Sequence, residues 1–290
     1  MKLEGVYLPI ITPFNNGKLD FKSYKKLIDY YINKGISGII PNGTTGECPT
    51  LCEYEVFELI EKTVEFVNGR VPVFVGMGSN FTNRLIKTIE NLSKYNILGI
   101  LSVCPYYNRP SQKGLYDHFV KISESTELKI IIYNIPYRTG VNLENNTIRR
   151  LAELNNIIGV KDSCGNINQS LELILNKPEK FSVLTGEDYL FYPLCASGGD
   201  GGILAAAHMN TEDYLCVFKN IKANNYFEAL RIWKNISKII PKLFEEPNPA
   251  PVKYLLKEND MIISDEVRLP ITEISCNLKS ELKMQHLYSC

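Results

Sequence analysis

The sequence has few of the residues and motifs that mark metal sites and nucleotide-binding loops. Its 290 residues include three histidines, which lie in distant segments at His118, His208 and His286. Eight cysteines are present without a Cys-x-x-Cys pair, and no histidine accompanies the closest two, Cys48 and Cys52. This pattern argues against a zinc site. A Gly-x-x-x-x-Gly-Lys-Ser/Thr loop and a Gly-x-Ser-x-Gly elbow are also missing, which argues against P-loop and α/β-hydrolase proteins.

Excess charge and long apolar runs are missing too. The chain has 32 Lys and Arg against 32 Asp and Glu, without a basic stripe that alternates with aromatic residues, so nucleic acid is not an expected partner. No apolar run approaches the roughly 18 to 20 residues of a transmembrane helix. The first residues lack the plan of a signal peptide. We therefore expect a cytoplasmic enzyme whose cysteines are reduced and mostly buried as small hydrophobic residues.

What the chain does have is a regular alternation of short Ile- and Val-rich runs with longer amphipathic stretches such as Phe21–Lys34. Successive runs begin about 20 to 35 residues apart, as repeated βα units do. Near-continuous apolar strands are typical of a parallel sheet covered by helices, and eight such units favour a closed (β/α)8 TIM barrel. The predicted strands are Val6–Ile11, Ile36–Ile40, Val71–Val75, Leu98–Val103, Lys129–Tyr133, Ile157–Val160, Phe181–Thr185 and Gly201–Ala205.

Two regions are predicted. Residues 1–210 would form the barrel, which is the catalytic domain. Residues 211–290 show helical patterning broken at Pro241 and at Pro247, Pro249 and Pro251. We expect them to form a C-terminal helical extension that packs on the barrel.

Lys161 is the most informative single residue, because it directly follows the apolar run Ile157–Val160. An amine at the C-terminal tip of a buried strand has its pKa lowered by burial. Such an amine can be neutral near physiological pH and attack a ketone to form a Schiff base. The alternative is a lysine that extends its ammonium group to solvent.

Other polar residues follow the predicted strands, where the active face of a barrel lies. Thr44 and Thr45, flanked by Gly43 and Gly46, could bind a small carboxylate through hydroxyl and backbone N–H groups. They could equally be the N-cap of a helix. Tyr106 and Tyr107 follow the fourth predicted strand, Tyr133 ends the fifth, and Tyr137 follows it.

These tyrosines could pack with satisfied hydroxyls, or two of them could form a chain that moves protons. Arg138 offers a bidentate fork for a substrate carboxylate, or else forms a surface salt bridge.

Several of these segments together resemble the dihydrodipicolinate synthase family, also called 4-hydroxy-tetrahydrodipicolinate synthase. This family belongs to the class I pyruvate-aldolase superfamily, which includes N-acetylneuraminate lyase. The resemblance extends nearly from end to end. It is carried by the segments Gly43-Thr44-Thr45-Gly46-Glu47, Tyr106-Tyr107-Asn108-Arg109-Pro110, Tyr133-Asn134-Ile135-Pro136, Arg138-Thr139-Gly140 and Gly159-Val160-Lys161-Asp162, together with Glu246-Pro247-Asn248-Pro249 and Arg268-Leu269-Pro270.

The resemblance implies a role for each matching residue. Lys161 would form the Schiff base with pyruvate, and Tyr133, Thr44 and Tyr107 would relay protons, with Tyr107 contributed across a dimer interface. Thr45 would bind the pyruvate carboxylate. Arg138 would bind the carboxylate of the second substrate. Gly186 and the Ile203 backbone would line the pocket. The resemblance implies a homotetramer of two dimers and requires no cofactor.

Two segments depart from the family pattern. The eighth strand has Gly202-Ile203-Leu204-Ala205-Ala206 where relatives often have Gly-Val-Ile-Ser-Val, and Asp162-Ser163-Cys164 follows the lysine where many relatives have Glu-Ala-Thr or Glu-Ala-Ser.

The residues at a regulatory site of the family also differ in this sequence. Lysine-inhibited members bind lysine in a cleft at the dimer interface, and Asn80 and Tyr106 match that cleft. Glu53, Val56 and Arg84 stand where responsive members carry two histidines and a glutamate. We therefore expect that lysine does not inhibit this protein.

The leading hypothesis is a synthase that condenses pyruvate with L-aspartate 4-semialdehyde in diaminopimelate and lysine biosynthesis. Arg138 favours it, because this aldehyde carries an α-carboxylate. The alternatives are a sugar-acid lyase, such as N-acetylneuraminate lyase or 2-keto-3-deoxy-gluconate aldolase, and a non-catalytic sensor of a keto acid on the same barrel.

Overall fold

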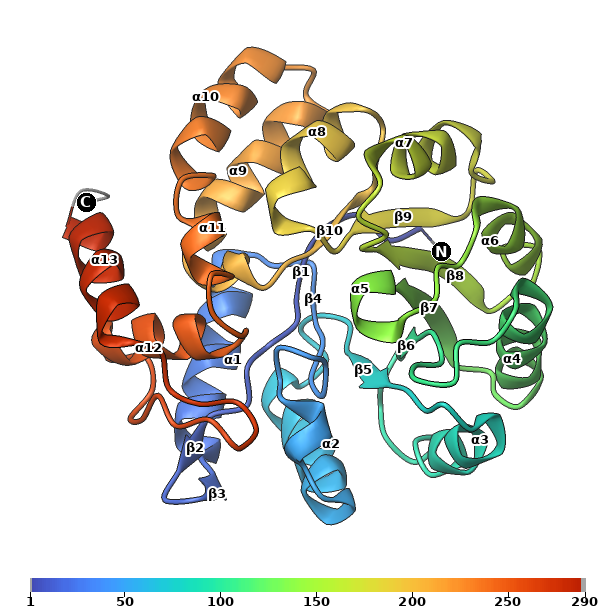
Figure 1. Ribbon diagram of the computed structural model, residues 1–290, viewed down its shortest axis with the longest axis horizontal. Coiled ribbons are helices and arrows are strands. Elements are labelled where there is room, and N and C mark those ends of the chain that lie inside the picture. The colour runs from blue at the N-terminus through green and yellow to red at the C-terminus, as the bar shows by residue number, and fades with distance from the viewer. Residues whose placement is uncertain (1, 288–290) are drawn as a thin grey trace.

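The computed structural model describes residues 2–287, with side chains for residues 2–284; the His286 side chain and all of Cys290 lie outside this part. Eight strands form one parallel sheet in the order β4-β1-β10-β9-β8-β7-β6-β5. A further bridge between Ile39 and Val73 joins its two ends, so the sheet closes on itself. This is the predicted (β/α)8 barrel, with its helices arranged around the strands (Figure 1).

Each predicted strand is present, with ends that differ by a few residues from the predicted ones. The barrel strands are β1 (Gly5–Leu8), β4 (Gly38–Ile39), β5 (Phe74–Met77), β6 (Gly99–Val103), β7 (Lys129–Asn134), β8 (Ile157–Asp162), β9 (Ser182–Thr185) and β10 (Gly201–Ile203).

Helices follow the strands along the chain. They are α1 (Phe21–Lys34), α2 (Glu53–Val67), α3 (Thr82–Glu90), α4 (Gln112–Glu124), α5 (Pro136–Thr139), α6 (Asn145–Leu151), α7 (Ile167–Asn176), α8 (Phe191–Ala196) and α9 (Thr211–Lys222). Helix α9 packs against β1 and α1, so the helix after the eighth strand covers the barrel wall. The chain then continues through α10 (Tyr226–Ile236), α11 (Ile240–Leu243), α12 (Ala250–Glu258) and α13 (Cys276–Leu287) to one side of the barrel (Figure 1).

The bounds of α1 show how local sequence sets an element. Asp20 caps its N-terminus by accepting from the backbone N–H groups of Lys22 and Ser23, and Gly35 ends it in the left-handed conformation that glycine adopts without strain. The buried face, with Leu27, Ile28 and Tyr31 among its residues, packs on the barrel. The helix therefore spans the predicted residues.

The apolar core has two parts, separated by the strands. Side chains alternate along β7: Ile130 and Ile132 belong to the layer between strands and helices, whereas Ile131 and Tyr133 belong to the cluster inside the barrel. Ile203 lies in the same interior cluster and is fully buried. The side chain of Tyr133 therefore lies inside the barrel.

One expectation about the cysteines is wrong. The described cysteines are free thiols, as expected, but only Cys104 and Cys195 are buried, and Cys52, Cys216 and Cys276 are exposed. The expected burial fails because Cys52 caps the N-terminus of α2, while Cys216 and Cys276 lie on exposed parts of C-terminal helices.

Candidate active site

Lys161 points into the barrel because of an irregularity in β8. The register between β7 and β8 pairs Ile130 with Ile157 but Ile131 with Gly159, so β8 has one extra residue at this point. Without this bulge, strict alternation from the inward Ile158 would turn Lys161 toward the helices. With it, Lys161 pairs with the inward-facing Tyr133 and lies inside β8 rather than just after its end.

The surroundings of Lys161 suit a neutral amine. Its side chain is buried, and its Nζ lies 4.3 Å from the ring centroid of Tyr133. Burial lowers the pKa of Lys161 to about 8, although the carboxylates of Asp188 and Glu187 favour the charged form. The nearby positive charge of Arg138 lowers the pKa further.

Gly186 leaves the space that the lysine needs. A Cβ atom placed on Gly186 would lie 2.5 Å from Cε of Lys161 and 2.3 Å from Oγ of Ser163. Any larger residue would displace the lysine, since carbon atoms do not approach so closely. The predicted pocket residue Gly186 thus lies directly against Lys161.

Tyr133 is buried beside Lys161, with 7% of its surface exposed. Burial raises the pKa of its hydroxyl well above the usual range, so the phenol is protonated at neutral pH. A protonated phenol next to an amine can donate a proton to oxygen or nitrogen that becomes basic during a reaction.

The loop after β4 carries Thr44 and Thr45 toward the same space. Its turn is closed by a hydrogen bond from the Gly46 N–H to the Gly43 carbonyl, at 3.0 Å. Thr45 is buried, and its Oγ1 accepts a hydrogen bond from Nδ2 of Asn248 at 3.0 Å. Because the Thr45 oxygen is the acceptor in this bond, the hydroxyl hydrogen of Thr45 can be donated to another group.

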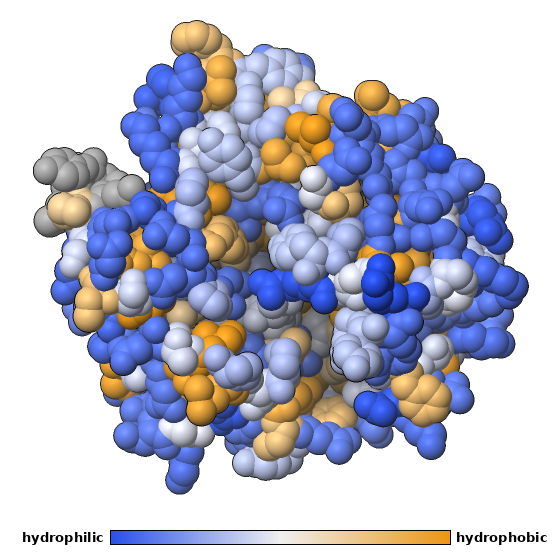
Figure 2. Space-filling view, viewed as in Figure 1, coloured by the Kyte–Doolittle hydropathy of each residue, from blue (hydrophilic) through white to orange (hydrophobic). Residues whose placement is uncertain are grey.

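These residues surround one cavity of about 430 Å³, whose lining includes Thr44, Thr45, Tyr133 and Lys161. The cavity extends outward past Tyr106 toward the start of α2. Figure 2 shows a hollow near the middle of the face that Figure 1 presents, rimmed largely by hydrophilic side chains. The size suits a small organic substrate.

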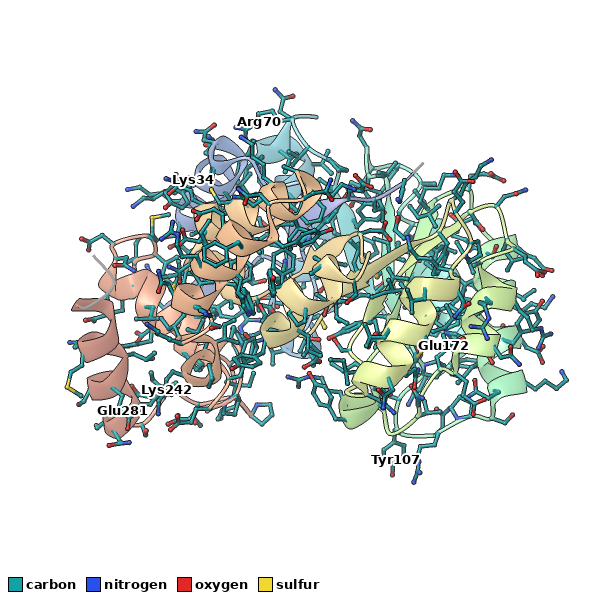
Figure 3. The ribbon with its side chains drawn as sticks, turned by 90° about the horizontal axis from the view of Figure 1, so that it is seen from above. Lys34, Arg70, Tyr107, Glu172, Lys242 and Glu281 are labelled. Carbon is teal, nitrogen blue, oxygen red and sulfur yellow. The ribbon has the colours of Figure 1, made fainter. Side chains whose placement is uncertain are left out.

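Four of the predicted site residues are not among those that line this cavity: Gly186 and Ile203, described above, and Tyr107 and Arg138. Tyr107 is 90% exposed, adopts a left-handed backbone with φ of 72°, and projects from the edge of the molecule (Figure 3). Arg138 is exposed on α5, with its guanidinium carbon 5.7 Å from the centroid of the Tyr137 ring. Its positive charge nevertheless lowers the pKa of Lys161 and of Cys48, a residue that lines the cavity.

The sequence did not predict three buried polar groups around the site. Asp188, whose pKa is raised by burial, lies near Lys161 and accepts a hydrogen bond from the Ala206 N–H at 2.7 Å. Asn248 bonds to Thr45, and Lys253 forms an ion pair with Glu47. Two prolines beside Asn248 and the position of Lys253 within an apolar helix were the available indications.

Within residues 2–287, no group of three or more His, Cys, Asp or Glu side chains could hold a metal ion. None of the helices in this part of the chain is long and apolar enough to cross a membrane.

A closed (β/α)8 barrel with a lysine buried in its cavity defines a class of proteins able to form a Schiff base with a carbonyl compound. Within that class, the sequence matches the dihydrodipicolinate synthetase family over residues 2–286, and the chain belongs to this family.

Individual relatives agree with this membership. The chain is 58% identical over 282 residues to 4-hydroxy-tetrahydrodipicolinate synthase 2 from Clostridium acetobutylicum, covering 97% of this chain and 99% of that protein. It is similar in structure to the 4-hydroxy-tetrahydrodipicolinate synthase of Methylacidiphilum fumariolicum SolV, with a TM-score of 0.96, 37% identity, and coverage of 99% and 96%. A relative described as a monomeric dihydrodipicolinate synthase variant gives a TM-score of 0.96 at 35% identity, covering 99% of this chain and 97% of that one.

Proposed function

We propose that the chain is a 4-hydroxy-tetrahydrodipicolinate synthase, which condenses pyruvate with L-aspartate 4-semialdehyde in diaminopimelate and lysine biosynthesis. It would be a lyase of the class I, Schiff-base-forming type. The observation that carries the proposal is the buried Lys161 amine, 4.3 Å from the Tyr133 ring, in a cavity that Thr44 and Thr45 also line. A cytoplasmic location stays a prediction.

The reaction begins at Nζ of Lys161. The neutral amine attacks the ketone carbon of pyruvate, and loss of water gives an imine. Loss of a methyl proton gives an enamine, whose carbon attacks the aldehyde carbon of the second substrate. The amino group of that substrate then displaces Lys161 by transimination, which closes the ring and frees the lysine.

Protein groups assist each step. Tyr133, with Thr44 and the Tyr107 hydroxyl, would move protons to and from the carbinolamine oxygen and the new hydroxyl. Thr45 would bind the pyruvate carboxylate through its hydroxyl and backbone. Arg138 at the entrance would bind the carboxylate of the aldehyde.

Tyr107 reaches the site in this proposal only from a second copy of the chain, since it is 90% exposed in its own. The proposed assembly is a homotetramer made of two such dimers. Sedimentation of the wild-type protein and of a Tyr107→Trp variant tests the dimer, because the bulkier ring should loosen it.

The direct test combines trapping with a substrate screen. Incubation with pyruvate and borohydride, followed by mass spectrometry, should show one reduced pyruvyl group on Lys161. A protein that only senses keto acids would show no adduct. A screen of aldehydes should then select L-aspartate 4-semialdehyde, whereas cleavage of sugar acids would indicate a lyase of the same superfamily.

Imine formation should depend on pH through Lys161. Because burial lowers its pKa to about 8, the fraction of neutral amine rises with pH and levels off above that value. The rate of adduct formation should therefore increase about tenfold per pH unit well below the pKa and become constant above it. Quenched-flow trapping across this range measures the profile. A rate that still rises near 10.5, the ordinary value for lysine, would contradict the assignment.

Lysine should not inhibit the enzyme. Glu53 and Val56 line the outer part of the cavity, where lysine-responsive members of the family carry histidines. The Arg84 guanidinium, 5.8 Å from the Phe81 ring centroid, replaces a glutamate that would pair with the ammonium group of the effector. A like charge at that position disfavours binding.

The measurement is the initial rate at subsaturating pyruvate while L-lysine is added into the millimolar range. The rate should stay constant, and an Arg84→Glu variant should become more sensitive. A saturable fall in the wild-type rate would show that Glu53 compensates and that the role assigned to Arg84 is wrong.

A further inference from the structure

A buried ion pair joins the C-terminal helices to the loop that carries Thr44 and Thr45. Lys253, on α12, is fully buried and donates to the carboxylate of Glu47, which is also fully buried. Its Nζ also donates to the Glu266 carbonyl at 2.8 Å. Burying both charges of a pair costs solvation that their attraction often fails to offset, so such a pair is weak evidence of stabilisation alone.

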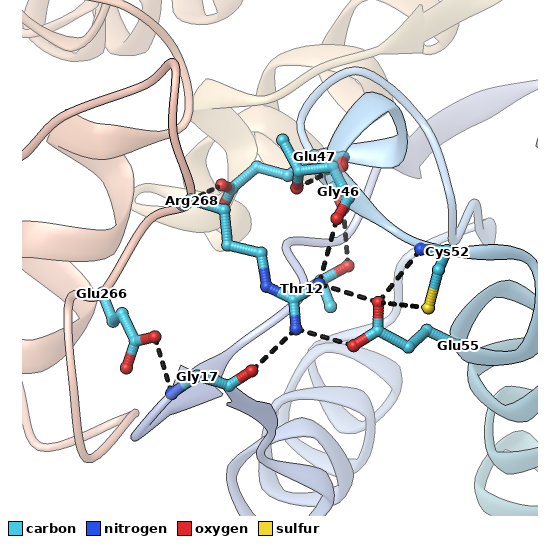
Figure 4. Close-up of polar contacts among 9 residues, drawn as sticks. Thr12, Gly17, Gly46, Glu47, Cys52, Glu55, Glu266 and Arg268 are labelled. Carbon is cyan, nitrogen blue, oxygen red and sulfur yellow. Dashed lines mark hydrogen bonds and ion pairs between the residues drawn. The ribbon is translucent and has the colours of Figure 1, made fainter.

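A backbone N–H group from the C-terminal region binds the other oxygen of the Glu47 carboxylate. The backbone N–H of Arg268 donates to Oε2 of Glu47 at 3.0 Å (Figure 4). The guanidinium of Arg268 donates to both oxygens of Glu55, at 2.6 and 2.8 Å, and to the Thr50 carbonyl at 3.0 Å. The segment from Glu47 to the start of α2 is thus held by bonds to Arg268.

Both cations also contact one aromatic ring. Nζ of Lys253 lies 4.1 Å and the guanidinium carbon of Arg268 lies 4.2 Å from the ring centroid of the buried Phe14. Such contacts fix the position of a desolvated cation. Phe14 therefore contacts both positive groups, one of which is paired with Glu47 and the other with Glu55.

Glu47 adopts a backbone conformation that requires such support. Its φ is 55°, in the left-handed region that residues with a Cβ seldom adopt. Its N–H donates to the Thr44 carbonyl at 3.0 Å, which closes the turn containing Thr45. Conformations of this kind persist where surrounding contacts hold them, and here the contacts come from Lys253 and Arg268.

We propose that Glu47, Lys253 and Arg268 are positioning residues that hold the Thr44–Thr45 turn in the geometry that binds the pyruvate carboxylate. This inference rests on the proposed function. The C-terminal region acts on the site through this turn. Asn248, which belongs to that region, donates a hydrogen bond to Oγ1 of Thr45. The hydroxyl hydrogen of Thr45 is therefore left to donate to the pyruvate carboxylate. None of the three positioning residues lines the cavity.

The test is the double variant Glu47→Gln with Lys253→Met. It removes both charges together and keeps the shapes of the side chains, so no unpaired charge remains buried. The pyruvate concentration that gives half-maximal borohydride trapping should rise about ten- to a hundredfold, the scale of a site misplaced by a remote change. The kcat at saturating pyruvate should change far less.

The matched control is a second ion pair, which is partly buried at the opposite end of the barrel. Nζ of Lys177 lies 2.5 Å from Oδ2 of Asp200, whose backbone carbonyl accepts from the N–H of Gly5 at the start of β1. The double variant Lys177→Met with Asp200→Asn removes a comparable pair. This control variant should need the same pyruvate concentration as the wild type for half-maximal trapping, even if its melting temperature falls.

A second variant covers the case in which the first fails to fold. Arg268→Lys keeps the charge of a partly exposed side chain but loses the fork to Glu55. It should raise the half-saturating pyruvate concentration with little change in kcat. Folded variants that trap pyruvate at the wild-type concentration would overturn the inference, whereas a wild-type protein that forms no adduct would overturn the proposed function instead.

Discussion

Replacing Lys161 with alanine is expected to abolish imine formation with pyruvate, and with it all turnover. The only other buried lysine among the described side chains is Lys253, which is paired with Glu47 and therefore not available as a nucleophile. Water and the tyrosine and threonine hydroxyls of the cavity cannot form an imine. The measurement is mass spectrometry after borohydride treatment, where the variant should show the unmodified mass at any pyruvate concentration.

Lys161→Arg should fail equally. A guanidinium is not deprotonated in a protein and so cannot attack a ketone. Circular dichroism should show a folded alanine variant, and Lys177→Ala should retain the adduct as a control. Substantial turnover by either Lys161 variant would refute the Schiff-base assignment.

The sequence predicted the strands well because their apolar runs are long and uninterrupted. It predicted their ends less well, because a strand ends where its neighbours stop pairing. The run Val71–Val75 becomes β5 at Phe74–Met77, for example, with Val73 bridging to Ile39 outside the strand. The hairpin of β2 (Phe14–Asn15) and β3 (Lys18–Leu19) was not predicted, although Asn16-Gly17 between them, both with positive φ, is a strong turn indication.

The sequence predicted a buried Lys161, but it did not predict the geometry around this residue. Lys161 was expected just beyond a strand, but it lies within β8 and faces inward because of the bulge at Ile158 and Gly159. A bulge depends on register with a neighbouring strand, which a single sequence does not encode locally.

The burial of Lys253 was not predicted from the sequence, for a related reason. A lysine in a helix is usually exposed, and the Glu47 that pairs with it lies more than two hundred residues away in the sequence. Contacts of this kind follow from the closed barrel and its C-terminal helices, so they could be described only once the fold was known.

Tyr133→Phe is expected to leave the fold and the binding of pyruvate intact but to slow turnover by roughly 10²- to 10⁴-fold, the usual contribution of a general acid or base. The phenylalanine ring keeps the contact with Nζ of Lys161, whose centroid distance is 4.3 Å, and keeps its place in the interior cluster. Only the hydroxyl is lost, and burial keeps that hydroxyl protonated in the wild type.

Two measurements separate a proton-transfer role from a packing role. The amount of trapped imine at equilibrium should match the wild type, while kcat falls, because the hydroxyl acts on the rates of dehydration and carbon–carbon bond formation rather than on affinity. Tyr7→Phe is the matched control, since Tyr7 is buried in the same interior cluster but does not line the cavity. A wild-type kcat in Tyr133→Phe would assign Tyr133 to packing, and an equal loss in Tyr7→Phe would attribute the effect to the barrel interior rather than to a proton that Tyr133 transfers.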